Sequence, residues 1–237
     1  MFVQIACAQV RSPVHVLDRI VWESLTTYHA PLAEGTALAR RFQRDVNLFA
    51  SARDDSKAAL AELSALVRPG EQVFVAQVPD IMIPSDLTEV KTALGVQMLA
   101  TRVPDAVPRT DITTLTDADA PEMLALAKLT EPGPFLERTH RMGRFIGIRS
   151  DGRLAAMAGE RMRIPGYTEL SGVCTHPDFR GRGFARRLSA AVVSDIFARG
   201  DRAFLHAWKS NHTAIALYEK LGFQLRAAVN IAVLTKL

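Results

Sequence analysis

The spacing of hydrophobic residues over the first hundred positions predicts a mixture of helices and strands. Residues 56–67 place leucines and a valine at helical spacing behind a serine, a residue type that favours the N-cap position. Residues 72–78 and 92–100 have the shorter period of strands, and prolines separate them. Residues 18–32 and 37–49 show no single period, so we expect helices or mixed segments there.

The second half of the chain alternates between the two periods more regularly. A strand at 112–115 precedes a helix at 117–129, which has an aspartate for its cap and a proline near its first turn. A short helix is expected at 135–142. Ser-Asp-Gly and Pro-Gly turns then join three strands as hairpins. These three strands are expected at 145–149, 154–164 and 167–175. They are followed by a helix at 184–199, a strand at 203–208, a helix at 211–223 and a last strand at 224–237.

A proline-rich stretch at 104–108 predicts a boundary, because proline fixes φ and restricts the residue before it. It separates an N-terminal α/β region, residues 1–108, from residues 109–237. The net charge of +4 is divided unevenly, with −2 in the first part and +6 in the second. The arginines of the second part cluster at a glycine turn with only Phe184 between them, so a phosphorylated ligand explains them more simply than nucleic acid.

Composition narrows the class of protein. The chain has 237 residues, of which 48% are hydrophobic and 23% charged, as is ordinary for a globular protein with a substantial core. No run approaches the ~18 apolar residues that a membrane span requires. Residues 1–10 are apolar but lack the basic start and the cleavage site of a signal peptide. We therefore expect a cytoplasmic protein without a membrane partner.

Cysteine and histidine give no support for a disulfide framework or a metal site. The two cysteines, Cys7 and Cys174, are too few for a framework of disulfides or for a cysteine-based metal site. The six histidines do not follow the spacing of zinc-binding motifs. No metal is therefore expected.

A glycine turn between a strand and a helix predicts a diphosphate site. From 173 to 185 the chain reads VCTHPDFRGRGFA. Gly181 and Gly183 can adopt positive φ, and the helix that begins at Phe184 leaves its first amides unpaired with a partial positive charge. Such amides suit a phosphate, although a plain loop and helix cap has the same pattern. The closing residues exclude a P-loop, and the missing third glycine excludes a dinucleotide fingerprint. Basic side chains around the turn add positive charge: Arg180, Arg182, Arg186 and Arg187.

A second motif lies downstream, where residues 211–223 read NHTAIALYEKLGF. Together with Arg180-x-x-Gly183-x-Ala185 and the strand before it, this motif resembles the GNAT superfamily of acetyl-CoA-dependent N-acetyltransferases, in the branch near the glycine N-acyltransferases. The resemblance covers about residues 109–237. It implies an α/β fold with a mixed sheet, in which acetyl-CoA lies between the strand before the turn and the strand after its helix. The implied contacts are to the pantetheine arm and the diphosphate, from Val173, Cys174, Thr175, Arg180, Gly181, Arg182, Gly183, Phe184, Ala185 and Asn211.

Direct transfer to an amine needs an acid for the departing thiolate and a base for the amine. Tyr218 matches the family's tyrosine, and its usual pKa of about 10 lies above that of a thiol, about 8.5, so it stays protonated. The alternative is a core aromatic on the apolar face of its helix. A two-residue Pro-Gly turn would place Glu160 and Glu169 on one face of a hairpin, and we rank Glu169 first as base. His176 is a third candidate in a sequence that also reads as a turn, and Cys174 is expected to be buried rather than nucleophilic.

The function predicted is transfer of an acetyl group from acetyl-CoA, without a metal, to an amine acceptor that is either a small molecule or a peptide. In the family that the chain resembles, the loop at 131–135 and the helix after it form one wall of the acceptor site. The alternative is a non-catalytic acyl-CoA-binding or sensing module. A homodimer stays open, as does a degenerate copy of the same fold in residues 1–108.

Overall fold

The computed structural model describes residues 15–237, and the predictions about Cys7 and residues 1–10 lie outside this range. Its centre is a mixed sheet in which neighbouring strands are antiparallel, except for one central pair that is parallel. In spatial order its eight strands are β4 (Gln72–Gln77), β11 (Phe223–Thr235), β5 (Thr88–Ala100), β10 (Arg202–Trp208), β9 (Tyr167–Thr175), β8 (Arg153–Ile164), β7 (Phe145–Ser150) and β6 (Ile112–Leu115). The predicted α/β fold with a mixed sheet is confirmed.

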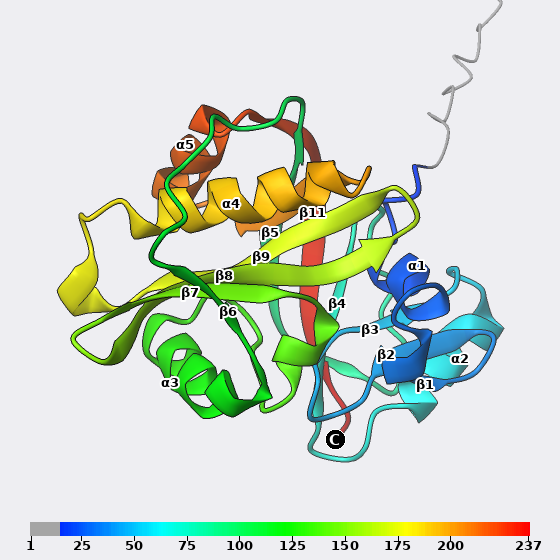
Figure 1. Ribbon diagram of the computed structural model, residues 1–237. Coiled ribbons are helices and arrows are strands. Elements are labelled where there is room, and N and C mark those ends of the chain that lie inside the picture. The colour runs from blue at the N-terminus through cyan, green and yellow to red at the C-terminus, as the bar shows by residue number, and fades with distance from the viewer. Residues whose placement is uncertain (1–14) are drawn as a thin grey trace, which may run out of the picture.

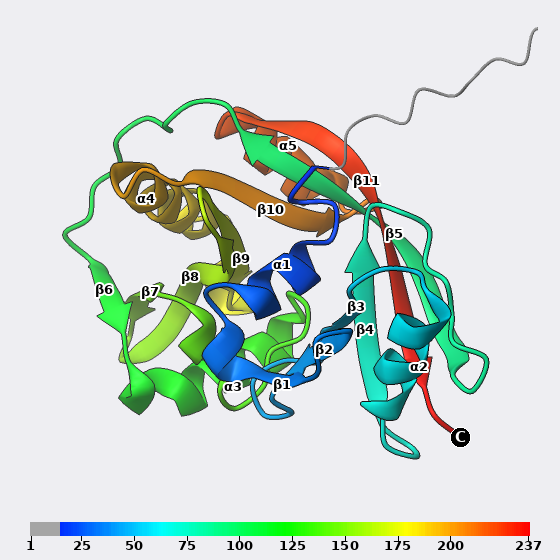
Figure 2. The same cartoon turned by 90° about the vertical axis from the view of Figure 1, so that its right-hand side faces the viewer.

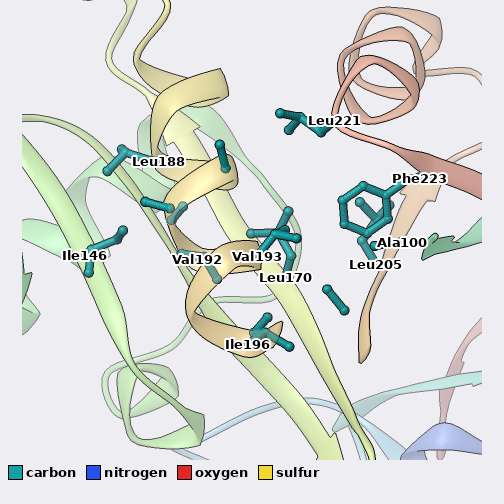
Figure 3. Close-up of a cluster of buried hydrophobic side chains, with 14 of the residues drawn as sticks. Ala100, Ile146, Leu170, Leu188, Val192, Val193, Ile196, Leu205, Leu221 and Phe223 are labelled. Carbon is teal, nitrogen blue, oxygen red and sulfur yellow. The ribbon is translucent and has the colours of Figure 1, made fainter. Parts of the chain in front are cut away.

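Helices cover both faces of this sheet (Figure 1). On one face lie α4 (Phe184–Ala198) and α5 (His212–Lys220), and on the other lies α3 (Ala120–Thr130). The inner side of α4 is an apolar stripe with a spacing of four residues, the pattern of a helix that packs on a sheet. Figure 3 shows this stripe against side chains of the strands, with Leu188, Val192, Val193 and Ile196 facing Ile146, Leu170 and Leu205.

The N-terminal elements form a smaller layer beside the face opposite α4 (Figure 2). They comprise α1 (Ile20–Thr26), a three-stranded sheet and α2 (Lys57–Ala65). The three strands are β1 (Ala33–Gly35), β2 (Ala39–Phe42) and β3 (Ala50–Ala52). The predicted cap of α2 is confirmed, since the Ser56 side chain accepts a hydrogen bond from the Ala59 amide at 3.3 Å. Of the segments without a clear period, residues 37–49 contain β2 and turns rather than a helix.

The main sheet crosses the boundary predicted at residue 108. Both β4 and β5 precede that residue, yet β5 pairs with β10 and β11 in the middle of the sheet. The two parts of the chain therefore share one layer of structure and much of one core. The division at residue 108, and the idea of a degenerate second copy, stay predictions.

Candidate functional site

The two parallel strands of the sheet separate along their length. β9 and β10 pair only as far as Glu169 and Phe204, and no described strand pairs with β9 on that side beyond Glu169. A cavity of about 230 Å³ opens there. Its walls come from β8, β9, β10, β11 and α5, from the loop at residues 130–134 and from the N-terminal elements. The loop expected beside an acceptor therefore does line this cavity.

Tyr218 lies in the wall of the cavity, on α5. Its ring packs edge-on against Phe223, with 5.9 Å between the ring centroids. Burial raises the pKa of the Tyr218 hydroxyl to about 12, and the nearby Cys174 adds to the increase. The ring is packed as the core interpretation expects, and the residue also lines the cavity, while its role as the acid stays a prediction.

A bulge in β9 bends the strand where the cavity opens. The pairing with β8 shifts by one residue around Gly172, which has a φ of 61°. A Cβ at this position would lie 2.7 Å from the Phe145 ring, so both the φ and the space require glycine. After the bulge, Val173 lines the cavity.

The two residues after Val173 have different surroundings. Cys174 is buried, and this burial raises the pKa of its thiol to about 12, so the thiol stays protonated and is a poor nucleophile. The prediction that Cys174 is a buried residue is confirmed. The Thr175 hydroxyl is buried without a hydrogen-bond partner among residues 15–237. A buried hydroxyl of this kind, beside the open edge of β9, suits a polar ligand.

The glycine turn leads from β9 through the short helix η4 (Pro177–Phe179) into α4. Gly181 and Gly183 have φ of 78° and 75°, with open space where a Cβ would lie, so their conformation alone calls for glycine. Within the described part of the chain, the backbone amides of residues 181–186 have no hydrogen-bond acceptor. Unpaired amides at the start of a 15-residue helix form an anion site.

The arginines beside the turn are not equivalent. Arg187 pairs with Asp111 and donates to the Pro108 carbonyl at 3.0 Å, so it ties the chain before β6 to α4. Arg182 stacks over the Phe179 ring, with 5.0 Å to the centroid. One of the four charges expected around the turn is therefore committed to a structural ion pair.

Two candidate residues act as helix caps. Asn211 accepts a hydrogen bond from the Ala214 amide at 3.1 Å, which confirms its N-cap interpretation, and it also lines the cavity. His176 accepts from the Asp178 amide at 3.2 Å and does not line this cavity. The turn interpretation of His176 is therefore the correct one.

The prediction that Glu160 and Glu169 share one face of the hairpin is wrong. The Pro-Gly turn starts the pairing as expected, but a bulge in β8 shifts the register by one residue. Glu160 then lies opposite Leu170 on the α4 side of the sheet, where it binds Arg199 at 2.7 Å. Because Glu160 does not line the cavity that holds Tyr218, it is excluded as the base of that site.

Glu169 lies on the other face, fully buried at 0% exposure between two basic side chains. Arg161 donates to its carboxylate from Nε at 2.9 Å and from Nη2 at 2.6 Å, and His206 Nδ1 lies 2.7 Å from it. Burial by itself would raise the pKa of Glu169, but Arg161 and these hydrogen bonds hold it well below its usual range. Glu169 is therefore ionised and has no surface from which to accept a proton directly.

His206 connects Glu169 to the cavity, which it lines. Its Nε2 lies 2.9 Å from the amide nitrogen of Gln97, and the oxygen of that amide accepts a hydrogen bond from Arg226. Because an amide nitrogen only donates, His206 Nε2 must accept and the ring proton belongs on Nδ1, facing Glu169. Arg226 in turn binds Asp18 at 2.5 Å, so the network reaches the N-terminal elements.

Sequence reasoning missed Arg161 and His206. Each is a polar residue within a strand of mainly apolar residues, and such residues are usually either paired or functional when buried. That signal could have marked both residues as members of a polar network. The bulge that brings Arg161 to Glu169 has no comparable signal in the sequence.

Comparisons with known proteins agree with this geometry. A family model described as FR47-like protein matches residues 145–231. The N-alpha-acetyltransferase RimI of Mycobacterium tuberculosis is 37% identical over 83 residues, which are 34% of this chain and 51% of that protein. The ribosomal protein bS18-alanine N-acetyltransferase of Salmonella typhimurium is 31% identical over 111 residues, which are 44% of this chain and 74% of that protein. A solved GNAT-family structure from Novosphingobium aromaticivorans is 41% identical, covers 94% of this chain and 100% of its own, and has a TM-score of 0.89.

The splayed sheet, the glycine turn and the cavity define a protein of the acetyltransferase class. The chain belongs to the GNAT family. It spans about half the length of the RimI relative, 51%. The narrower placement near the glycine N-acyltransferases stays a prediction.

Residues 15–237 contain neither a candidate membrane-spanning helix nor a candidate metal-binding group. No helix in this range has the length and apolar character to cross a membrane. No group of three or more histidine, cysteine, aspartate or glutamate residues in this range is arranged to hold a metal ion.

Proposed function

We propose that this chain transfers an acetyl group from acetyl-CoA to an amine. The observation that carries the proposal is that β9, whose open edge borders the cavity lined by Tyr218, runs through a short helix directly into the turn with the unpaired amides of residues 181–186. The amides suit the diphosphate of acetyl-CoA. The backbone of β9 and the Thr175 hydroxyl offer hydrogen bonds to the pantetheine arm, and Asn211 adds a polar group at the other side.

Tyr218 is the proposed acid. The amine nitrogen attacks the thioester carbonyl, a C–N bond forms, and the C–S bond breaks with its electron pair on sulfur. Tyr218 then donates its proton to that sulfur. The pKa of about 12 makes Tyr218 a weaker acid than a tyrosine in water, but burial raises the pKa of the nearby Cys174 thiol to about 12 as well. Burial disfavours a departing thiolate in the same way, so its protonation by Tyr218 removes a buried negative charge.

Glu169 is the proposed source of basic charge, and it acts through His206. In the proposed step, the amine or a bound water takes the place of the Gln97 amide beside His206 Nε2. Nε2 then accepts the proton of the amine, either directly or through that water. The imidazolium formed in this way is stabilised by the Glu169 carboxylate at Nδ1, 2.7 Å away. The proton then passes to solvent.

The cytoplasmic location also stays a prediction.

The test is calorimetric titration with acetyl-CoA, followed by an assay of thiol release with a panel of amines. We expect one site per chain and turnover with at least one amine. Absence of binding would contradict the proposal. Binding without turnover for any amine would favour the acyl-CoA sensing module instead.

The role of His206 is tested by His206→Gln, which can keep a hydrogen bond to Glu169 but cannot take up a proton. We expect kcat to fall by about 10²–10⁴-fold, the usual contribution of a general base. We also expect the KM for the amine to stay unchanged, a split between kcat and KM that a merely structural histidine would not cause. Acetyl-CoA affinity should stay as in the unmodified chain.

A further inference from the structure

The N-terminal part of the chain contributes to the wall of the cavity that Tyr218 also lines. Apolar residues of α1, of the segment before β3, of β4 and of β11 form this apolar wall: Ile20, Phe49, Phe74, Ala76, Val229 and Ile231. The first four lie outside residues 145–231, the part that the family model matches. An apolar wall of this kind suits a compact apolar group.

One cation, the guanidinium of Arg161, lines the cavity beside this apolar wall. Arg161 is 9% exposed, and its guanidinium lies 5.1 Å from the centroid of the Phe49 ring. Glu169 occupies Nε and Nη2, whereas Nη1 has no hydrogen-bond partner among residues 15–237. Nη1 lies beside Gly133, in the loop that lines the cavity. The edge formed by Nη1 and the remaining hydrogen of Nη2 is a planar fork, the geometry that a carboxylate fits.

A group of opposite charge lines the same cavity. Glu131 follows α3 as its C-cap and has a φ of 48°, a left-handed conformation that is uncommon for glutamate. No salt bridge joins Glu131 to a cation within the described residues. The exposed Glu131 contributes negative charge at the rim, while the free cationic edge and the apolar wall match the carboxylate and the side chain of an apolar amino acid.

Building on the proposed function, we infer that the acceptor is a free amino acid with an apolar side chain, whose carboxylate binds Arg161 and whose side chain packs against the apolar wall. The amine then lies toward Tyr218 and the thioester. A peptide or protein acceptor has an amide in place of this carboxylate, so it cannot form an ion pair with the free edge of Arg161. The acceptor class thus differs from that of the Salmonella relative, which is named as a ribosomal-protein alanine N-acetyltransferase.

The test compares matched acceptors with the unmodified protein, so that it does not depend on a variant. Leucine and phenylalanine are compared with isoamylamine and phenethylamine, which lack the carboxylate, with the corresponding amino-acid amides, and with a tripeptide that begins with leucine. We expect kcat/KM to be about 10–100-fold higher for the amino acids, as for other hydrogen bonds to charged groups. Equal or higher values for the amines, the amides or the tripeptide would overturn the inference. So would failure to acetylate either amino acid.

A variant assigns this selectivity to Arg161. Arg161→Lys keeps a positive charge beside Glu169 but loses the planar fork, so we expect the ratio of leucine to isoamylamine to fall at least about tenfold. Arg199→Lys is the matched control, because Arg199 pairs with Glu160 on the other face of the sheet, and it should keep the ratio. An unchanged ratio in Arg161→Lys would also overturn the inference. Acetyl-CoA titration separates the two proposals, since binding and amine turnover can persist when carboxylate selectivity is absent.

Discussion

The proposed site has a cofactor end and an acceptor end, which are built by different means. The cofactor end consists of backbone: a bulge in β9, a glycine turn and the first amides of α4, all within one short stretch of sequence. The acceptor end consists of side chains that are far apart in sequence, namely Phe49, Arg161, Glu169 and His206. Backbone sites tolerate many side chains but few conformations, whereas a side-chain site depends on each residue and its partner. The same kind of substitution should therefore affect the two ends differently.

Tyr218 stands where the two ends meet, and its removal should have the largest effect. Tyr218→Phe keeps the packing against Phe223 but removes the proton donor. We expect kcat to fall by about 10²–10⁴-fold, while the Kd for acetyl-CoA stays within about twofold. Steady-state kinetics and calorimetry measure the two quantities. A parallel loss of rate and affinity would show that the hydroxyl binds cofactor rather than donating a proton.

The two glutamates of the hairpin test the acceptor end with one substitution at two places. Glu169→Gln leaves Arg161 buried without its carboxylate, and we expect the free energy of unfolding to fall by about 3–5 kcal/mol. Glu160→Gln breaks a pair with Arg199, which is one-third exposed, and should cost only about 1 kcal/mol and leave turnover unchanged. Urea denaturation and kcat/KM measure both variants. Equal costs would contradict the assignment of the two glutamates to different environments.

Acid titration gives a second view of Glu169. Its pKa is lower in the folded chain than the usual value of about 4.3, so the carboxylate stabilises the fold above that pH and the contribution is lost as pH falls below it. Between about pH 5 and pH 3, the unmodified chain should lose stability more steeply than Glu169→Gln. Urea midpoints over this range measure the difference. Parallel curves would show that Glu169 does not stay ionised through its pairing with Arg161 and His206.

The sequence predicted the local structure of the proposed cofactor end well because its signals are local. The positive φ of Gly181 and Gly183, the Asn211 cap and the burial of Cys174 each depend on neighbours within a few residues. Most strands were also predicted within a few residues of their observed ends, because apolar periodicity reports burial directly. The position of Tyr218 in the cavity wall follows from the same helix periodicity.

The acceptor end could not be predicted in the same way. A single extra residue in β8 reverses which side of the sheet is faced by the side chains that lie beyond it, counted from the Pro-Gly turn. Nothing in the sequence marks that bulge. As a result Glu160 was placed on the wrong face, and the pairing of Glu169 with Arg161 was not seen. Phe49 and Phe74 reach the cavity only through the packing of the N-terminal elements on the sheet, which depends on contacts between distant segments.

The smallest expected effect concerns the cofactor end, where two glycines that flank α4 provide a matched pair of positions for substitution. Gly183 and Gly200 lie at opposite ends of the helix, have φ of 75° and 85°, and have open space where a Cβ would lie. Alanine at either position should therefore cost about 1–2 kcal/mol of stability through backbone strain alone. Only Gly183→Ala also disturbs the unpaired amides, so its Kd for acetyl-CoA should rise about tenfold, whereas that of Gly200→Ala should not change. Calorimetric titration of both variants is decisive, because equal affinities would mean that the diphosphate does not bind at this turn.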